Sequence, residues 1–368
     1  MIMKRLLLVL AAVCMALSCK EEKFEIHRGV NIAHWLSQSS ARGERRATFF
    51  TEEDVRRIAG WGFDHVRIPI DEEQMFQEDG TPDKEAFSLL HNALDLCGKY
   101  HLRAIVDLHI LRSHYFNASV KPLFTERAAQ EAFYECWRRI SGELKGYSTA
   151  MVAYELMNEP VADDPEDWNK IVKECYASIR ELEKDRVLVI GSNRWQSFNT
   201  AAQLSIPEGD ANIILSFHYY NPMILTHYGG SWTDFRNYGG PVHFPGQTVT
   251  EDEMALRPAE EQAGFGRWTR QQYDKDRFRA EFGQVVEVAA RYGIPVYCGE
   301  YGCLSPRQND EARYAWLRQM NEVFEELGIA RAVWCYREGP GGFGILSGAS
   351  TQADHQMLEA LLRENQKS

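Results

Sequence analysis

Residues 151–160 read MVAYELMNEP, an apolar run that gives way to the polar residues Asn158 and Glu159 and then to Pro160. Short, near-continuous apolar runs are typical of parallel strands that are covered on both faces. Similar runs recur along the chain. We expect eight strands, at residues 29–32, 65–68, 104–108, 151–156, 187–190, 213–217, 295–298 and 330–335.

Helical patterns separate these runs. The first begins at Thr51 and Asp54, which form a capping box. Further helices are expected at 83–100, 125–144, 167–183, 277–292, 310–327 and 354–363, with only a short one between the fifth and sixth strands. Eight strands alternating with helices, without a linker or repeat over residues 24–368, predict an α/β fold of one domain, a single (β/α)₈ TIM barrel.

One connection is unusually long. From residue 219 to about 268 the chain shows neither helical nor strand periodicity, and it follows the sixth strand. Loops of this length in a compact domain are usually functional or disordered. Its aromatic residues argue against disorder: Tyr228, Trp232, Phe235, Tyr238, Phe244 and Trp268. On a barrel this loop is expected over the face that carries the active site.

The N-terminus has the pattern of an export signal. Lys4 and Arg5 precede an apolar run over residues 6–13, too short for the roughly 20 residues of a membrane span. Residues 16–19, ALSC, resemble a lipobox that would make Cys19 the lipidated residue, and residues 20–22, KEE, resemble a surface-export tether. We therefore expect a lipoprotein signal at 1–18, a tether at 19–26 and a catalytic domain at 27–368. The protein would be an outer-membrane or cell-surface lipoprotein, held at the membrane only through this anchor. An ordinary cleaved signal, with a periplasmic or secreted product, is the alternative.

Charge and cysteine content narrow the range of partners. The net charge of −12 disfavours nucleic acid, whose phosphates require a basic face. A neutral ligand such as a polysaccharide fits better. The cysteines show no metal-ligand spacing, and whether Cys298 and Cys303 form a disulfide stays open.

Two glutamates stand where a barrel places its chemistry. Glu159 follows the fourth expected strand and Glu300, in residues 297–302 (YCGEYG), follows the seventh. Catalytic residues of TIM barrels lie at the C-terminal ends of the strands, and strands four and seven face each other across the mouth. Hydrolysis of a glycosidic bond needs two carboxyl groups in different protonation states, about 5–5.5 Å apart when configuration is retained.

These motifs, in this order, resemble glycoside hydrolase family 5 over nearly all of residues 28–346. The resemblance implies that Glu159 is the acid/base and Glu300 the nucleophile. It also implies six supporting positions: Arg67 beside the nucleophile, His109 after the third strand, Asn158 at the sugar 2-hydroxyl, His218 and Tyr220 after the sixth strand, and Trp334 as an aromatic floor. His34 and Trp35 follow the first strand, where a sugar subsite would lie, although Trp35 could equally pack in the core.

The function implied is a retaining glycoside hydrolase acting on β-linked glucan, with endo-β-1,4-glucanase the leading interpretation. A β-mannanase, a xyloglucanase, a mixed-linkage glucanase and an exo-acting β-glucosidase remain alternatives within the enzymes. A catalytically inactive, glycan-binding surface lipoprotein is the alternative outside them. The mechanism implies no metal or organic cofactor, since two carboxyl groups suffice. The oligomeric state is left open.

Overall fold

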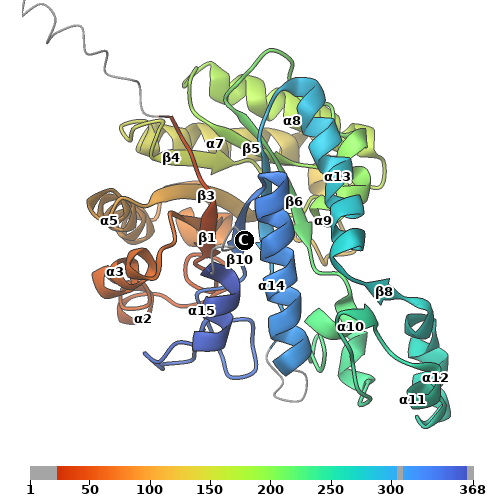
Figure 1. The fold of residues 1–368 in the computed structure, drawn as a ribbon. Coiled ribbons are helices and arrows are strands. Elements are labelled where there is room, and N and C mark those ends of the chain that lie inside the picture. Colours follow the sequence, from red (N-terminus) through yellow and green to blue (C-terminus); the bar gives the residue numbers. More distant parts are fainter. Residues whose placement is uncertain (1–22, 305–309, 363–368) are drawn as a thin grey trace, which may run out of the picture.

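Eight parallel strands close into a barrel in the computed structural model, which describes residues 23–304 and 310–362 (Figure 1). Around the barrel they follow chain order, and β1 pairs with both β2 and β10. The strands are β1 (Arg28–Asn31), β2 (His65–Asp71), β3 (Arg103–Ile110), β4 (Val152–Glu155), β5 (Leu188–Gly191), β6 (Ile213–Tyr219), β9 (Val296–Tyr301) and β10 (Ala330–Val333). The predicted (β/α)₈ barrel is confirmed.

Helices cover the outside of the barrel (Figure 1). The long ones are α3 (Glu52–Trp61), α5 (Lys84–Lys99), α7 (Arg127–Leu144), α8 (Pro165–Arg180), α13 (Lys275–Tyr292), α14 (Asp310–Leu327) and α15 (His355–Leu362). Shorter ones are α2 (Glu44–Ala47), α4 (Glu72–Met75), α6 (Pro122–Thr125), α9 (Asn193–Gln196) and the 3₁₀ helix η1 (Phe198–Gln203). The capping box at Thr51 is present. No helix in the described ranges is long and apolar enough to span a bilayer.

The barrel interior has an apolar layer near the N-terminal ends of the strands and a polar layer above it. The apolar layer is closed from below by Ile26 and is filled by small and branched side chains with one tyrosine: Ile105, Ala153, Val187, Val189, Ile214, Tyr297 and Ala332. Successive strand residues point to opposite faces. Asp107 and Glu155 lie two residues after Ile105 and Ala153 on the same strands. Their side chains therefore also point into the barrel, where they begin the polar layer. The buried ring of His65 also reaches the apolar layer, where it bonds to Tyr297 on one side and to Asp64 on the other.

The connection after β6 is more ordered than its sequence predicted. Instead of lacking regular structure, it contains short elements: α10 (Met223–Thr226), η2 (Asp234–Asn237), β7 (Gly246–Gln247), α11 (Glu251–Ala255), α12 (Ala259–Phe265), η3 (Gly266–Arg270) and β8 (Gln272–Tyr273). Five of its six aromatic residues named above are buried, and Trp232 is 59% exposed. Elements of two to seven residues are too short for a periodic pattern to develop, which explains why the sequence did not reveal them. In Figure 1 this insertion projects at the lower right, below α13.

Two boundaries near the motifs differ from expectation. The fourth strand ends at Glu155, so Glu159 lies on the loop after it. The seventh barrel strand, β9, continues to Tyr301 and contains Glu300. The cysteines in the described ranges are all free thiols, so Cys298 and Cys303 are not paired with each other here. The segment with Cys19 lies outside the described residues.

Candidate active site

Glu159 and Glu300 meet at the mouth of the barrel. A carboxylate oxygen of each and a ring nitrogen of His218 all lie within 4.8 Å of one another. The side chain of Glu159 is 13% exposed and that of Glu300 is 6% exposed, so both are enclosed while remaining reachable. The nearest oxygens of the two carboxyl groups are thus at most 4.8 Å apart, which suits the short separation of a retaining pair better than the wider one of an inverting pair.

Arg67 holds the floor of the site together. Its guanidinium is fully buried and bonds to groups from β1, β3, β9 and the β4 segment. The acceptors are Oδ1 of Asn31 (2.9 Å), Oδ2 of Asp107 (3.0 Å), Oε2 and Oε1 of Glu155 (2.6 and 3.1 Å), Oδ1 of Asn158 (2.9 Å) and Oε1 of Glu300 (2.8 Å). A planar guanidinium offers donors in a fixed fork. It therefore sets the orientation of Glu300 and of Asn158 together.

Asp107 and Glu155 belong to this site, although no role for them was predicted. Both are fully buried and both pair with Arg67. Burial raises the pKa of Asp107 to about 7, against the opposing charge of Arg67, and burial also raises the pKa of Glu155. The sequence contained a signal for this role. Each is an acidic residue inside an otherwise apolar strand, and a buried acidic side chain is rare unless it is paired with a cation.

His218 and Tyr220 bind the two carboxyl groups from the β6 side. Nδ1 of His218 is 3.0 Å from Oε1 of Glu159 and 3.7 Å from Oε2 of Glu300. Burial lowers the pKa of His218 well below its ordinary value, so the ring is neutral and Nδ1–H can donate to Glu159. The hydroxyl of Tyr220 donates to Oε2 of Glu300 at 3.0 Å.

The two carboxyl groups differ in their ability to ionise. Burial raises the pKa of Glu159 well above its ordinary value, and the neighbouring charge of Glu300 raises it further. Burial also raises the pKa of Glu300, but the charge of Arg67 and the Tyr220 hydrogen bond oppose that rise. Glu300 therefore ionises first and Glu159 keeps its proton, which is the division of roles that a nucleophile and a general acid require.

The loop after β5 supports Glu159 from behind. Arg194, Trp195 and Gln196 have φ angles of 55°, 60° and 52°, a left-handed conformation that costs non-glycine residues about 1–3 kcal/mol each and clusters at functional sites. Oε1 of Gln196 accepts from the backbone N–H of Glu159 (3.2 Å), and its amide donates to Oε1 of Glu155 (3.1 Å). A Cβ on Gly191 would lie 2.0 Å from Nε2 of Gln196, so only glycine leaves room for this bridge.

Trp334 and His109 stack at the other side of the mouth. Their ring centroids are 5.7 Å apart and their planes differ by 14°. Nδ1 of His109 lies 2.7 Å from Oδ2 of Asp107, and the amide of Gln38 donates to its Nε2 at 3.1 Å. Burial lowers the pKa of His109 to about 4, so the ring is neutral near pH 7.

His34 and Trp35 separate into different environments. His34 is 31% exposed and meets the Trp334 ring edge-on, at 6.1 Å between centroids. Trp35 is 1% exposed, packs on Phe50 and donates its indole N–H to the Arg46 carbonyl (2.8 Å). A ring with no free face cannot stack on sugar, so the expectation of a sugar contact for Trp35 was wrong and its alternative, core packing, is what the structure shows.

Two groups of side chains in the described part of the chain bring three metal-ligating atoms within 4.8 Å of one another. One is Glu159, His218 and Glu300. The carboxylate oxygens of its two glutamates already accept hydrogen bonds from Arg67, Tyr220 and His218. The other is His34, Cys335 and Glu338, beside Trp334. The first group has the composition and spacing of an acid/base and nucleophile pair.

Comparison with known proteins agrees with this geometry. The family model described as Cellulase (glycosyl hydrolase family 5) matches residues 23–339. The chain belongs to glycosyl hydrolase family 5. It is accordingly a glycosidase that hydrolyses O-glycosyl bonds, and the retaining mechanism follows from the family.

Similar proteins are named as a cellodextrinase and as endoglucanases. Cellodextrinase A of Ruminococcus flavefaciens is 30% identical over 336 residues, covering 90% of this chain and 92% of the relative. Endoglucanase C of Acetivibrio thermocellus is 30% identical over 317 residues, covering 84% and 91%. Among solved structures, endoglucanase Cel5A of Thermotoga maritima superposes with a TM-score of 0.72 at 24% identity, covering 91% of this chain and 97% of that one, which supports the fold.

Replacing Tyr220 by Phe removes one donor from Glu300 and nothing else. A hydrogen bond to a charged group contributes about 1.5–3 kcal/mol, so kcat/KM should fall about 10- to 100-fold. This bond lowers the pKa of Glu300. Without it that pKa rises, and the acidic limb of the pH profile should move to higher pH.

The matched control is Tyr219→Phe, because the Tyr219 hydroxyl bonds to Glu281 outside the barrel mouth. Its acidic limb should stay in place. An unchanged acidic limb in Tyr220→Phe would show that this hydroxyl does not stabilise the Glu300 carboxylate.

Proposed function

We propose that the chain is a retaining endo-β-1,4-glucanase in which Glu300 is the nucleophile and Glu159 the acid/base. The observation that carries the proposal is the pair of enclosed carboxyl groups with oxygens within 4.8 Å, of which only Glu300 bonds to Arg67. The relatives named cellodextrinase and endoglucanase, matched over most of their length, support β-1,4-glucan as the substrate.

The reaction follows from the two protonation states. Glu300 attacks the anomeric carbon and forms a glycosyl–enzyme ester, while Glu159 gives its proton to the departing glycosidic oxygen. The ester neutralises Glu300 and removes the charge that raised the pKa of Glu159. Glu159 then takes a proton from the incoming water, whose oxygen attacks the anomeric carbon and releases Glu300.

Asn158 has a donor available for the sugar. Its Oδ1 accepts from Arg67, while its buried Nδ2 has no hydrogen-bond partner in the part of the chain that the structure describes. A buried unsatisfied donor is costly unless a ligand uses it. This supports the role that the family resemblance implies, a hydrogen bond to the 2-hydroxyl of the sugar being cleaved.

Exposed aromatic surface beside Glu159 favours cleavage within a chain. Trp195 is 46% exposed. Its backbone N–H donates to the carbonyl of Pro160, the residue after Glu159, and its indole N–H donates to the carbonyl of Phe116 at 3.1 Å. Because Glu159 protonates the leaving group, a ring fixed here is suited to stack on leaving-group sugars. The backbone N–H of Trp334 bonds to the carbonyl of Tyr301, the residue after Glu300, so a tryptophan stands beside each carboxyl group. This supports sugar binding on both sides of the cleaved bond, as an endo enzyme needs.

Product analysis tests the endo assignment. With cellopentaose as substrate, cellobiose and cellotriose should appear together from the earliest time points, with the β-anomer formed first by NMR. Glucose and cellotetraose as the first products would contradict it in favour of an exo-acting β-glucosidase. Faster turnover of mannan, xyloglucan or mixed-linkage glucan would mean that this glycan is the substrate instead of β-1,4-glucan. If no glycan is turned over, the protein is an inactive glycan-binding protein.

Chemical rescue with azide tests the two roles. Glu159→Ala should lose about 10²–10⁴-fold on cellooligosaccharides, because they need a general acid. On an aryl β-cellobioside with an acidic phenol its first step should survive, and azide should restore turnover and give the β-glycosyl azide. Glu300→Ala should be inactive on all substrates, and any azide product should be the α-anomer. The opposite anomers would mean that the two roles are exchanged.

We also propose that the protein is a lipoprotein of the outer membrane or cell surface, anchored through Cys19. Support comes only from the signal pattern before Cys19 and the acidic residues after it. Several acyl chains anchor a protein firmly, whereas one holds it marginally. Cys19→Ala should move the protein from the membrane fraction to the soluble one. Equal membrane association of the variant and the wild type would contradict the anchor.

A further inference from the structure

The loop after β10 brings a cysteine and a glutamate to the histidine that follows β1. Oε1 of Glu338 is 3.7 Å from Nε2 of His34, and Oε2 of Glu338 is 3.8 Å from Sγ of Cys335. One ligand atom from each of the three residues lies within 4.8 Å of the others. Three hundred residues separate His34 from Cys335, so no spacing motif joins them in the sequence.

His34 is held toward Glu338 without being satisfied by it. Its Nε2 is buried and has no hydrogen-bond partner among the described residues, since 3.7 Å is too long for a direct bond. Its backbone has φ 61°, in the left-handed region that costs a non-glycine residue about 1–3 kcal/mol and is typical of functional sites. The ring is therefore held with its Nε2 3.7 Å from the Glu338 carboxylate and without a hydrogen bond to any residue that the structure describes.

The glycine-rich stretch at residues 339–344 closes around Glu338. A Cβ on Gly342 would lie 2.6 Å from Cδ of Glu338, and one on Gly344 would lie 2.6 Å from its backbone nitrogen. The backbone N–H of Phe343 donates to Oε2 of Glu338 at 2.8 Å. Ligand carboxylates are commonly oriented by such a donor. These glycines thus allow the loop to clamp the carboxylate against His34 and Cys335.

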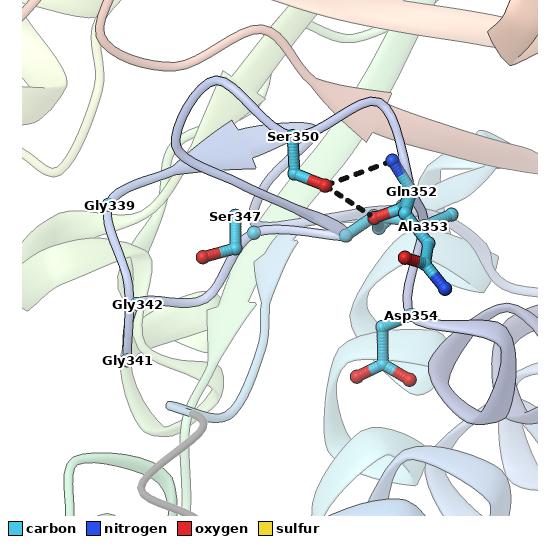
Figure 2. A pocket seen from close by; sticks show the side chains of 10 residues that line it. Gly339, Gly341, Gly342, Ser347, Ser350, Gln352, Ala353 and Asp354 are labelled. Atoms are coloured by element: carbon cyan, nitrogen blue, oxygen red, sulfur yellow. Dashed lines mark hydrogen bonds between the residues drawn. The ribbon is translucent and has the colours of Figure 1, made fainter.

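The same loop also borders a cavity of about 260 Å³, but that cavity offers little chemistry. Figure 2 shows Gly339, Gly341 and Gly342 on one side of it and Ser350 and Gln352 on the other, with the Ser350 hydroxyl bonded to the backbone of Gln352. Neither Glu338 nor Cys335 lines it. The cluster of interest is therefore the one beside Trp334.

We propose that His34, Cys335 and Glu338 form a Zn²⁺ site at the rim of the substrate cleft. Zinc takes imidazole, thiolate and carboxylate ligands in tetrahedral geometry, at about 2.0–2.1, 2.3 and 2.0–2.2 Å. Those lengths place a nitrogen and an oxygen ligand about 3.4 Å apart, and a sulfur and an oxygen ligand about 3.6 Å apart. The two observed distances, 3.7 Å to His34 and 3.8 Å to Cys335, start from different oxygens of Glu338, so zinc would take both carboxylate oxygens or the carboxylate would turn. The three ligand atoms, which lie within 4.8 Å of one another, would draw together on binding.

Binding would deprotonate the Cys335 thiol, whose proton leaves to solvent, because zinc coordinates the thiolate. Three protein ligands leave a fourth position for water or for a sugar hydroxyl. His34 meets the Trp334 ring edge-on, so the ion would sit beside that ring. The site does not depend on the proposed function, since metal binding can be measured without turnover.

Cobalt titration of the full-length, chelator-treated protein tests the site. Co²⁺ replaces zinc and gives an intense thiolate-to-metal charge-transfer band in the near ultraviolet. We expect one equivalent to bind with this band and one equivalent of Zn²⁺ to abolish it. Cys335→Ser should lose the band, and Glu338→Gln should weaken Zn²⁺ binding by at least about 10-fold, since even outer-shell changes cost 10- to 100-fold.

Two controls separate this site from others. Cys97→Ala removes a thiol buried on α5 and should leave the band unchanged. Glu300→Gln disables the other cluster and should also leave it unchanged. The proposal is overturned if the wild type shows no band, if Cys335→Ser keeps it, or if Glu300→Gln loses it. Glu338→Gln provides a second ligand variant should Cys335→Ser fail to fold.

Discussion

A single buried guanidinium, that of Arg67, is the interaction on which the site depends. A cation removed from water is costly unless it is paired and hydrogen-bonded. Arg67 meets this demand with acceptors from four other barrel strands, β1, β3, β4 and β9, and from Asn158 in the segment after β4. Removing one partner of a buried ion pair typically costs 3–5 kcal/mol. The barrel mouth and the catalytic geometry are therefore stabilised by the same contacts.

The unequal distribution of these contacts divides the chemistry between two similar side chains. Glu300 receives donors from Arg67 and Tyr220, whereas Glu159 has His218 and the repulsion of Glu300 itself. The protein thus keeps one carboxyl group ionised and the other protonated a few ångströms apart. The strained loop at residues 194–196 contributes by fixing Glu159 from behind while presenting Trp195 to solvent.

Much of this arrangement could be predicted from the sequence because strand order fixes position in a barrel. The eight apolar runs predicted the fold, and the order of the motifs placed Arg67, Glu159 and Glu300 at one mouth. The prediction failed where position in space does not follow from order along the chain. Trp35 follows a strand but turns into the core. Asp107 and Glu155 lie within expected strands, yet their pairing with Arg67 depends on which face of the strand they occupy. The cluster at Glu338 depends on close backbone approach at Gly342 and Gly344, which no local pattern reveals.

The most direct test is an NMR titration of the Glu159 carboxyl carbon in the wild type and in Glu300→Gln, which keeps the shape of Glu300 and removes its charge. If the charge of Glu300 holds the proton on Glu159, the pKa of Glu159 is elevated in the wild type and falls clearly in the variant. The drop mimics the change that the enzyme itself makes on forming the glycosyl–enzyme ester. A pKa of Glu159 that is ordinary in the wild type, or unchanged in Glu300→Gln, would contradict the account.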